Sequence, residues 1–227
     1  MDTGVPMDEV VMAYITDQLG GVVTAAAYGE TRGRIHLVER PAQGGQPMWY
    51  DEAVKTVTQA GIMTGTGNGF EPEATVTRAT VFQTLYNLEG KPETANRMAI
   101  WPDAQGTWYE PAARWAQQVG LTEGTGDGFQ GDRAITRAEI VTILERYAEM
   151  KGLDVAVESA TDVLAYDDAE DVAPWAVPAF QWAVDKGVVS GKTADNGPLL
   201  APNDTATRAE LAQILTNCLD FFPKAAQ

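Results

Sequence analysis

A short motif that recurs along this chain of 227 residues constrains its fold more than any other feature. Thr-Arg-Ala-Glu occupies residues 136–139 and recurs in full at residues 207–210, and residues 77–80 repeat it with Thr80 in place of Glu. A Thr followed three residues later by Glu is typical of a capping box, in which both side chains satisfy free N–H groups of a helix's first turn. Each copy precedes an apolar run with helical spacing, such as Ile140, Ile143, Leu144 and Tyr147. The motif therefore predicts three helix starts.

The Arg of each copy (Arg78, Arg137 or Arg208) falls on the first helical turn, where free N–H groups and the helix dipole favour an anion. Each copy is therefore a candidate anion site. The alternative is that the box only caps a helix and that the Arg pairs with a neighbouring carboxylate. Because the chain has a net charge of −16, local Arg groups would have to hold an anion against the field of the whole protein. The same charge makes a nucleic acid an unfavourable partner.

From Trp49 onward the chain repeats a longer unit. A Trp begins each first helix and a Gly follows twelve residues later, in the pairs Trp49 and Gly61, Trp108 and Gly120, and Trp175 and Gly187. This spacing predicts a helix of about three turns that is closed by a Gly. In the Gly-rich loops that follow, residues 65–70 parallel residues 124–129, whereas the loop at 191–202 is longer and diverges. The unit is helix, Gly-rich loop and capped helix, three times over.

This repetition predicts a divergent N-terminal segment and three repeats, at residues 1–46, 47–100, 101–160 and 161–227. In the N-terminal segment, residues 8–19 predict a helix and residues 22–28 and 34–38 predict two short strands, so we expect a small α/β segment there. A further echo precedes the first helix of the second and third repeats. An aromatic residue comes just before an acidic one, in Trp101-Pro102-Asp103 and Tyr166-Asp167-Asp168.

The chain offers no sign of a disulfide framework or of a membrane span. Its one cysteine, Cys218, lies among apolar residues and is predicted to belong to the core. No stretch approaches the roughly 18 apolar residues of a membrane-spanning helix. No basic start followed by an apolar run is present, so we expect either a cytoplasmic protein or a piece of a longer exported one.

Catalytic and metal-binding constellations are weak. The single histidine, His36, has no evident Cys or Ser partner and is interpreted as structural. Asp127 and Asp132 flank a loop but lack the ligand series of a calcium site. The acidic pairs at residues 167–168 and 170–171 could serve as glycosidase carboxylates, yet adjacent acidic residues are more typical of a solvated loop. We expect no enzyme, no metal and no cofactor.

The Trp residues and the Gly-rich loops each have a structural and a functional interpretation. Trp49, Trp108 and Trp175 are either core anchors or platforms on which a sugar ring stacks. The loops either form tight turns or cradle a phosphate, and the second is disfavoured because they follow a helix and not a strand. The functional interpretation gains weight because Trp, loop and Arg recur together, and packing alone does not require the Arg.

The combined pattern resembles the S-layer homology domain. It consists of a Trp before an Ala-rich helix, a Gly-rich Asp/Asn-Gly-Phe turn and Thr-Arg-Ala-Glu, in three tandem copies over roughly residues 47–222. The resemblance implies a mainly α fold, in which three helix–loop–helix repeats form a pseudo-threefold arrangement around a central helical bundle. It also implies a monomeric, non-catalytic protein.

The resemblance further implies the non-covalent attachment of an exported protein to the bacterial cell wall. The family binds secondary cell-wall polysaccharides, typically through a pyruvylated sugar, in grooves between adjacent repeats. A ketal-linked pyruvate carries a carboxylate, which a guanidinium is well suited to bind. The partner would be this polysaccharide, without membrane insertion, and the location would be the extracellular cell wall or surface layer. The ligand-binding residues would be Arg78, Arg137, Arg208, Trp49, Trp108, Trp175, Gly65, Gly124 and Gly191.

Two alternatives stay open. The chain could be an interaction scaffold that keeps the fold without binding a glycan, or the anchor fragment of a larger secreted enzyme. Two departures from the pattern distinguish the three Arg sites: Thr80 weakens the first capping box, and the longer third loop changes the third groove. We therefore hypothesise that Arg137 marks the most competent site.

Overall fold

The computed structural model describes residues 47–94, 100–157, 163–194, 197–219 and 221–222. All of the helices and strands named below belong to Trp49–Gln227, which forms a unit of its own. The helix and strands predicted for the N-terminal segment, and His36 with them, lie outside the described residues.

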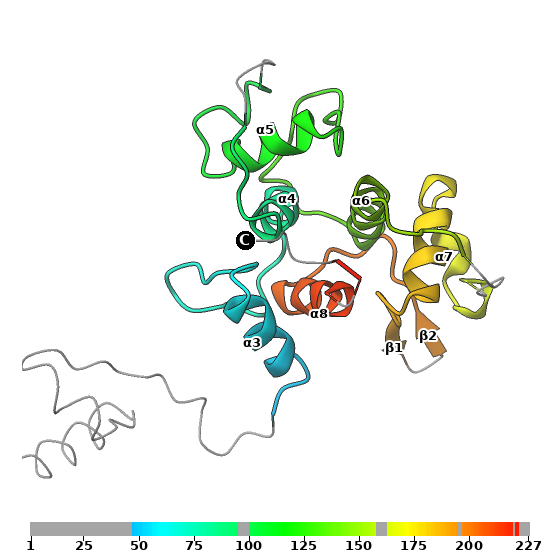
Figure 1. Cartoon of the computed structure of the whole chain (residues 1–227). Coiled ribbons are helices and arrows are strands. Elements are labelled where there is room, and N and C mark those ends of the chain that lie inside the picture. Colours follow the sequence, from blue (N-terminus) through cyan, green and yellow to red (C-terminus); the bar gives the residue numbers. More distant parts are fainter. Residues whose placement is uncertain (1–46, 95–99, 158–162, 195–196, 220, 223–227) are drawn as a thin grey trace, which may run out of the picture. The chain divides into compact units, whose positions relative to one another are not determined.

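The described residues are mainly helical, as predicted (Figure 1). A short antiparallel hairpin pairs β1 (Lys192–Ala194) with β2 (Gly197–Leu199). Three single turns of 3₁₀ helix precede α7, namely η1 (Val163–Ala165), η2 (Ala169–Asp171) and η3 (Pro174–Ala176). The α-helices are α3 (Asp51–Gln59), α4 (Arg78–Leu88), α5 (Glu110–Gln118), α6 (Arg137–Met150), α7 (Val177–Asp185) and α8 (Arg208–Cys218).

The second helix of each repeat begins where the recurring motif predicts. Helices α4, α6 and α8 start at the Arg of their motif copy, and the preceding Thr is the N-cap. The capping box is complete in α8 and in α6, where the Thr136 hydroxyl accepts the Glu139 N–H at 3.3 Å and the Glu139 carboxylate accepts the Thr136 N–H at 3.0 Å. In α4 the Thr77 hydroxyl accepts the Thr80 N–H at 3.3 Å, but Thr80 has no carboxylate to complete the box.

The first helix of each repeat ends at the predicted glycine. Helices α3, α5 and α7 have nine residues each. The glycine two residues beyond each helix has a positive φ, of +70° at Gly61, +74° at Gly120 and +68° at Gly187. A residue with a Cβ adopts this left-handed conformation only at a steric cost, which explains why glycine closes all three helices.

Each first helix packs against the second helix of another repeat. Helix α5 packs on α4, α7 on α6, and α3 on α8, so that the three pairs form a closed cycle. In Figure 1, α4, α6 and α8 lie together at the centre, and α3, α5 and α7 lie around them. The predicted pseudo-threefold symmetry stays a prediction, and the cycle of contacts is the observation that bears on it.

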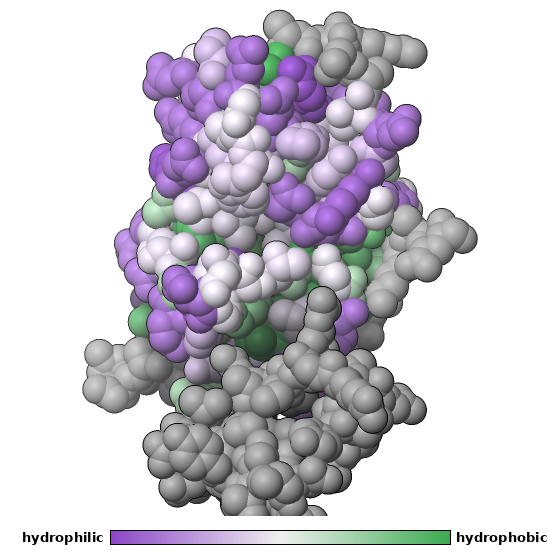
Figure 2. Space-filling view, turned by 90° about the vertical axis from the view of Figure 1, so that its left-hand side faces the viewer, coloured by the Kyte–Doolittle hydropathy of each residue, from purple (hydrophilic) through white to green (hydrophobic). Residues whose placement is uncertain are grey.

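The core forms where these helix pairs meet. It includes Val57 of α3, Leu85 of α4 and Leu144 of α6, each fully buried, and each such side chain contributes about 1.5–3 kcal/mol. Cys218 is also fully buried, as predicted, and burial raises the pKa of its thiol. The face shown in Figure 2 is mostly polar, with hydrophobic residues visible in small areas between polar ones. None of the helices in the described ranges is long and apolar enough to cross a bilayer.

Candidate functional site

Three grooves in the Trp49–Gln227 unit bring the predicted site residues together. Each groove contains the Arg of one motif copy, one Gly-rich loop and one Trp, and we name each groove after this motif Arg. The Arg78 groove has a volume of about 490 Å³, the Arg137 groove about 570 Å³ and the Arg208 groove about 460 Å³. Their members are Arg78 with Gly124 and Trp175, Arg137 with Gly191 and Trp49, and Arg208 with Gly65 and Trp108.

The Arg, the loop and the Trp of each groove come from three different repeats. In the Arg78 groove, Arg78 belongs to the first repeat, Gly124 to the second and Trp175 to the third. The other two grooves follow the same rule in cyclic order. The sequence predicts grooves between adjacent repeats, and the contribution of the third repeat to each groove is a finding of the structure. Recurrence identifies equivalent residues, but it does not say which copies meet in space.

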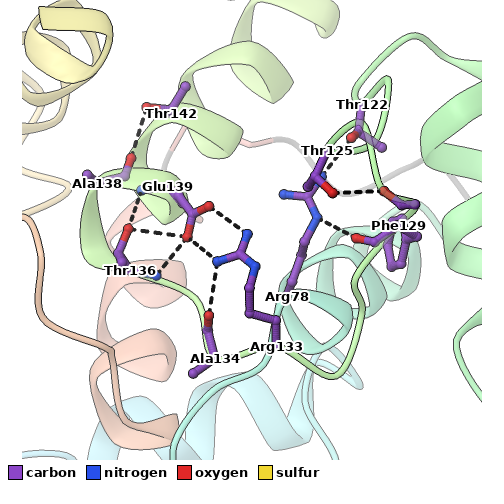
Figure 3. Close-up of polar contacts among 11 residues, drawn as sticks. Arg78, Thr122, Thr125, Phe129, Arg133, Ala134, Thr136, Ala138, Glu139 and Thr142 are labelled. Atoms are coloured by element: carbon purple, nitrogen blue, oxygen red, sulfur yellow. Dashed lines mark hydrogen bonds and ion pairs between the residues drawn. The ribbon is translucent and has the colours of Figure 1, made fainter. Parts of the chain in front are cut away.

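Arg78 lines its groove. Its side chain points to Thr122 and Phe129 of the second repeat (Figure 3). Its side-chain Nε donates to the Phe129 carbonyl at 3.0 Å, and Nη2 donates to the Thr122 hydroxyl at 2.8 Å. The guanidinium also lies 4.9 Å from the Phe82 ring centre and 5.5 Å from that of Phe129. Arg78 is only 6% exposed, so these contacts hold its cation in a fixed position.

The other two Arg residues hold their loops in the same manner. Arg137 donates through Nε to the Leu200 carbonyl at 2.9 Å. Arg208 donates through Nε to the Phe70 carbonyl and through Nη2 to the Thr64 carbonyl, both at 2.7 Å. The third loop, which the sequence describes as divergent, therefore presents a carbonyl to its Arg at the equivalent position.

The three guanidinium groups are cations without an ion-pair partner among the described residues. Burial lowers the pKa of Arg78, Arg137 and Arg208, because it removes water from the charged form. Nearby carboxylates, such as Glu139 for Arg78, oppose this shift. None of the ion pairs between described residues includes any of the three. The interpretation in which each Arg simply pairs with a carboxylate is therefore wrong for this part of the chain.

The N–H groups of the first helical turns are already bound within the protein. At the start of α6, the Arg137 N–H donates to the Asp204 carbonyl at 2.9 Å and the Ala138 N–H donates to the Pro202 carbonyl at 3.0 Å. The starts of α4 and α8 are bound to loop carbonyls in the same way. The expectation that free N–H groups help to hold an anion is wrong here, because these groups fasten neighbouring repeats together. The guanidinium remains as the anion-binding group.

The three Trp residues are exposed. Trp49 is 60% exposed, Trp108 is 61% and Trp175 is 56%. The interpretation of these residues as core anchors is therefore wrong. An indole with more than half of its surface free, beside a groove that contains a cation, can stack on the apolar face of a sugar ring.

The three loop glycines permit a close approach within the loop. An added Cβ would lie 2.8 Å from a carbonyl oxygen of the same loop at Gly65, 2.9 Å at Gly124 and 2.8 Å at Gly191. The assignment of Gly191 as the counterpart of the other two is supported by this shared geometry. The glycines shape the grooves through backbone conformation, since they have no side chain to bind a ligand.

Two aspartates outside the predicted set of site residues also hold the loops, by accepting hydrogen bonds from backbone N–H groups. Asp103 accepts the Phe129 N–H at 3.0 Å and the Gln130 N–H at 2.6 Å. Burial alone would raise the pKa of Asp103, but these two N–H groups hold that pKa below its usual value. Asp168 binds the third loop equivalently, through the N–H groups of residues 200 and 201, at 2.8 and 2.6 Å.

The aromatic–acidic echo at 101–103 and 166–168 was the signal that could have identified these aspartates. Because both oxygens of Asp168 accept backbone N–H groups, the pair at 167–168 does not act as two free glycosidase carboxylates.

The chain is similar to several bacterial proteins over short parts of their lengths. It is 30% identical to the surface-layer 125 kDa protein of Lysinibacillus sphaericus over 74% of this chain and 14% of that protein. It is 28% identical to exoglucanase XynX of Acetivibrio thermocellus over 76% of this chain and 16% of that protein. It is 27% identical to the cellulosome-anchoring protein of Acetivibrio thermocellus over 69% of this chain and 35% of that protein. The chain thus spans a minor part of each of these relatives.

A family model points to the same relationship. The model of the S-layer homology domain matches residues 42–82, 102–141 and 165–212, which together make up more than half of the chain. Each match includes one copy of the recurring Arg. The matches end at residues 82, 141 and 212, in the second turns of α4, α6 and α8. The chain belongs to the S-layer homology domain family.

Proposed function

We propose that this chain is a non-catalytic anchoring module that binds an anionic, typically pyruvylated, secondary cell-wall polysaccharide in the three grooves. The observation that supports this most directly is that each groove combines a guanidinium without an ion-pair partner with an exposed Trp. A pyruvyl ketal presents a carboxylate to the first group and a sugar ring to the second.

The contacts of each Arg distinguish the nitrogen that holds the loop from those that can bind a ligand. The Nε–H group donates to a loop carbonyl, and this bond fixes the orientation of the guanidinium plane. The remaining N–H groups on the groove side donate to the carboxylate of the ligand. A charge-assisted hydrogen bond of this kind contributes about 1.5–3 kcal/mol when it is partly shielded from water.

The similar proteins support a role at the cell surface. Two of them are named as a surface-layer protein and a cellulosome-anchoring protein. Others are named as an exoglucanase and an amylopullulanase, and this chain matches only 16% and 9% of their lengths. We propose that this chain is the anchoring part of an exported protein, and that such enzyme activities belong to segments outside the matched region.

Co-sedimentation with bacterial cell-wall sacculi tests the proposal. One sample of sacculi keeps its secondary polysaccharide and the other is stripped of it with acid. The informative variant combines Trp49→Ala, Trp108→Ala and Trp175→Ala, because these exposed side chains can be removed without opening the core. We expect binding to unstripped walls alone and a loss of about tenfold or more in the triple variant.

The matched control is Leu164→Ala, since Leu164 is 83% exposed and lines none of the three grooves. This variant should bind as the parent does. Equal binding to stripped walls, or full binding by the triple Trp variant, would contradict the proposal and favour a protein-interaction scaffold. The single Trp variants test the hypothesis that the Arg137 groove is the most competent, which predicts the largest loss for Trp49→Ala.

A further inference from the structure

The Arg78 groove contains a second guanidinium, that of Arg146. Arg146 lies on α6 and lines the same groove as Arg78. It is exposed, and it forms no hydrogen bond or ion pair with any described residue. Burial raises the pKa of the neighbouring residue Glu145, and the charge of Arg146 opposes this rise. Glu145 does not line the groove. The groove therefore contains two arginines whose charges are not paired, in a protein with a net charge of −16.

The acidic residues of this groove do not neutralise both arginines. Glu139 lines the groove, but its two oxygens accept the guanidinium of Arg133 at 2.7 and 2.9 Å (Figure 3). Glu123 is the other carboxylate in the lining. Both Arg78 and Arg146 line the groove, and the charge of Arg146 lowers the pKa of Arg78, after burial and after the charge of Arg133, so the two cations repel each other. A bound anion would relieve this repulsion.

The other two grooves carry an amide at the position of Arg146. Asn87 of α4 donates through Nδ2 to the Ile62 carbonyl at 2.9 Å, and Asn217 of α8 donates to the Val188 carbonyl at 3.0 Å. The side-chain amides of Asn87 and Asn217 therefore bind backbone carbonyls of the protein itself. In the Arg78 groove the equivalent residue is charged, and its side chain is free of such a bond.

The other two grooves differ from the Arg78 groove in the number of their cations and in whether these cations form ion pairs. In the Arg137 groove the second cation, Lys192, is paired with Asp204 at 3.2 Å and with Glu210 at 3.1 Å. In the Arg208 groove, Arg208 is the one charged side chain among the described lining residues. The Arg78 groove alone among the three thus combines two unpaired guanidinium groups.

We infer that the Arg78 groove binds a glycan segment with two acidic groups, one at Arg78 and the second at Arg146, whereas the other two grooves each bind one acidic group. This inference rests on the proposed function, since it assigns a ligand class to one of the same grooves. Arg146 is then the residue that determines the charge specificity of the groove. Arg78 supplies a buried contact from α4, and Arg146 supplies an exposed contact from α6.

Calorimetric titration with two synthetic probes tests the inference. The first probe is a disaccharide with a pyruvyl ketal on one sugar, and the second carries a ketal on both sugars. The protein is the full chain with Trp49→Ala and Trp108→Ala, which weakens the other two grooves. We expect the doubly acidic probe to bind on the order of three- to tenfold more tightly, with a preference that shrinks at high salt.

Arg146→Asn installs the residue that the other grooves use, and Arg146→Gln keeps a better helix former at this position. Both variants should lose the preference for the doubly acidic probe and retain the affinity for the singly acidic one. Lys55→Asn is the matched control, because it removes a positive charge on α3 outside the Arg78 groove.

The outcomes separate this inference from the proposed function. If the protein with Trp49→Ala and Trp108→Ala bound the two probes with equal affinity, the inference would be overturned and the anchoring function would stay intact. A preference for the doubly acidic probe that survives Arg146→Asn would have the same meaning. A preference lost equally in Lys55→Asn would overturn it as well, since overall charge would then be the cause. Failure of the parent to bind either probe would overturn the proposed function, and the inference with it.

Discussion

At the scale of single residues, the grooves depend on arginines that act as structural fasteners and as cations at once. Arg78 is buried, and two of its nitrogens donate to Phe129 and Thr122 of another repeat. Removing its side chain would leave the Phe129 carbonyl without this donor and open space beside two aromatic rings. The loss of ligand binding in such a variant would therefore mix a lost contact with a damaged fold.

We predict that Arg78→Ala lowers the free energy of unfolding by about 2–4 kcal/mol, because a buried, hydrogen-bonded side chain is lost. Arg146→Ala should change it by no more than about 0.5 kcal/mol, because Arg146 is exposed and unpaired. Urea unfolding at equilibrium measures both values. An unchanged midpoint for Arg78→Ala would mean that the loop is held by other contacts, such as those of Asp103.

At the scale of elements, the start of each second helix is a junction between repeats. The capping Thr satisfies the third N–H of α6, and loop carbonyls of another repeat satisfy the first two. The same few residues therefore set the helix start, the attachment of a loop and the position of the guanidinium. In α4 this junction lacks a capping carboxylate, because Thr80 stands where α6 has Glu139.

We predict that Thr80→Glu raises the free energy of unfolding by about 0.5–1 kcal/mol, by completing the capping box of α4. The same change should weaken anion binding in the Arg208 groove, because Thr80 lines that groove and the new carboxylate would lie near Arg208. Thr80→Gln is the control, since an amide can complete the box without adding charge. If both variants weakened binding equally, bulk and not charge would be responsible. Urea unfolding and wall co-sedimentation measure the two effects.

At the scale of the whole Trp49–Gln227 unit, the closed cycle of helix pairs makes the three repeats depend on one another. Helix α3 of the first repeat packs on α8 of the third, and every groove draws residues from all three repeats. A linear array of repeats would have two free ends, whereas a cycle has none. We therefore expect the unit to unfold as one cooperative structure.

We predict that Val57→Ala, a cavity variant at a fully buried position of α3, the helix that packs on α8, costs about 1–3 kcal/mol. Amide hydrogen exchange should then accelerate to the same extent in the slowest-exchanging positions of α4, α6 and α8, although the change is confined to α3. Val54→Ala, a change at a partly buried position of the same helix, should have a smaller effect. Faster exchange confined to α3 and α8 would show that the repeats open independently.

Features whose causes lie within a few residues could be predicted from the sequence alone. A capping box spans four residues, and a closing glycine acts on the turn that it occupies, so the starts of α6 and α8 and the ends of α3, α5 and α7 could be predicted from local patterns. The recurrence of Arg, Gly and Trp also identified the residues that line the grooves.

Which copies of the repeat meet depends on long-range packing, and local patterns do not contain this information. The bond from Arg78 to Thr122 joins residues 44 positions apart, and the bond from Arg208 to Thr64 joins residues 144 positions apart. Equivalent repeats make each alternative pairing look equally good in the sequence, and only packing into a closed cycle selects one. The exposure of the Trp residues, the occupied N–H groups of the first turns and the unpaired charge of Arg146 follow from that selection, because burial and pairing are properties of neighbours brought together by the fold.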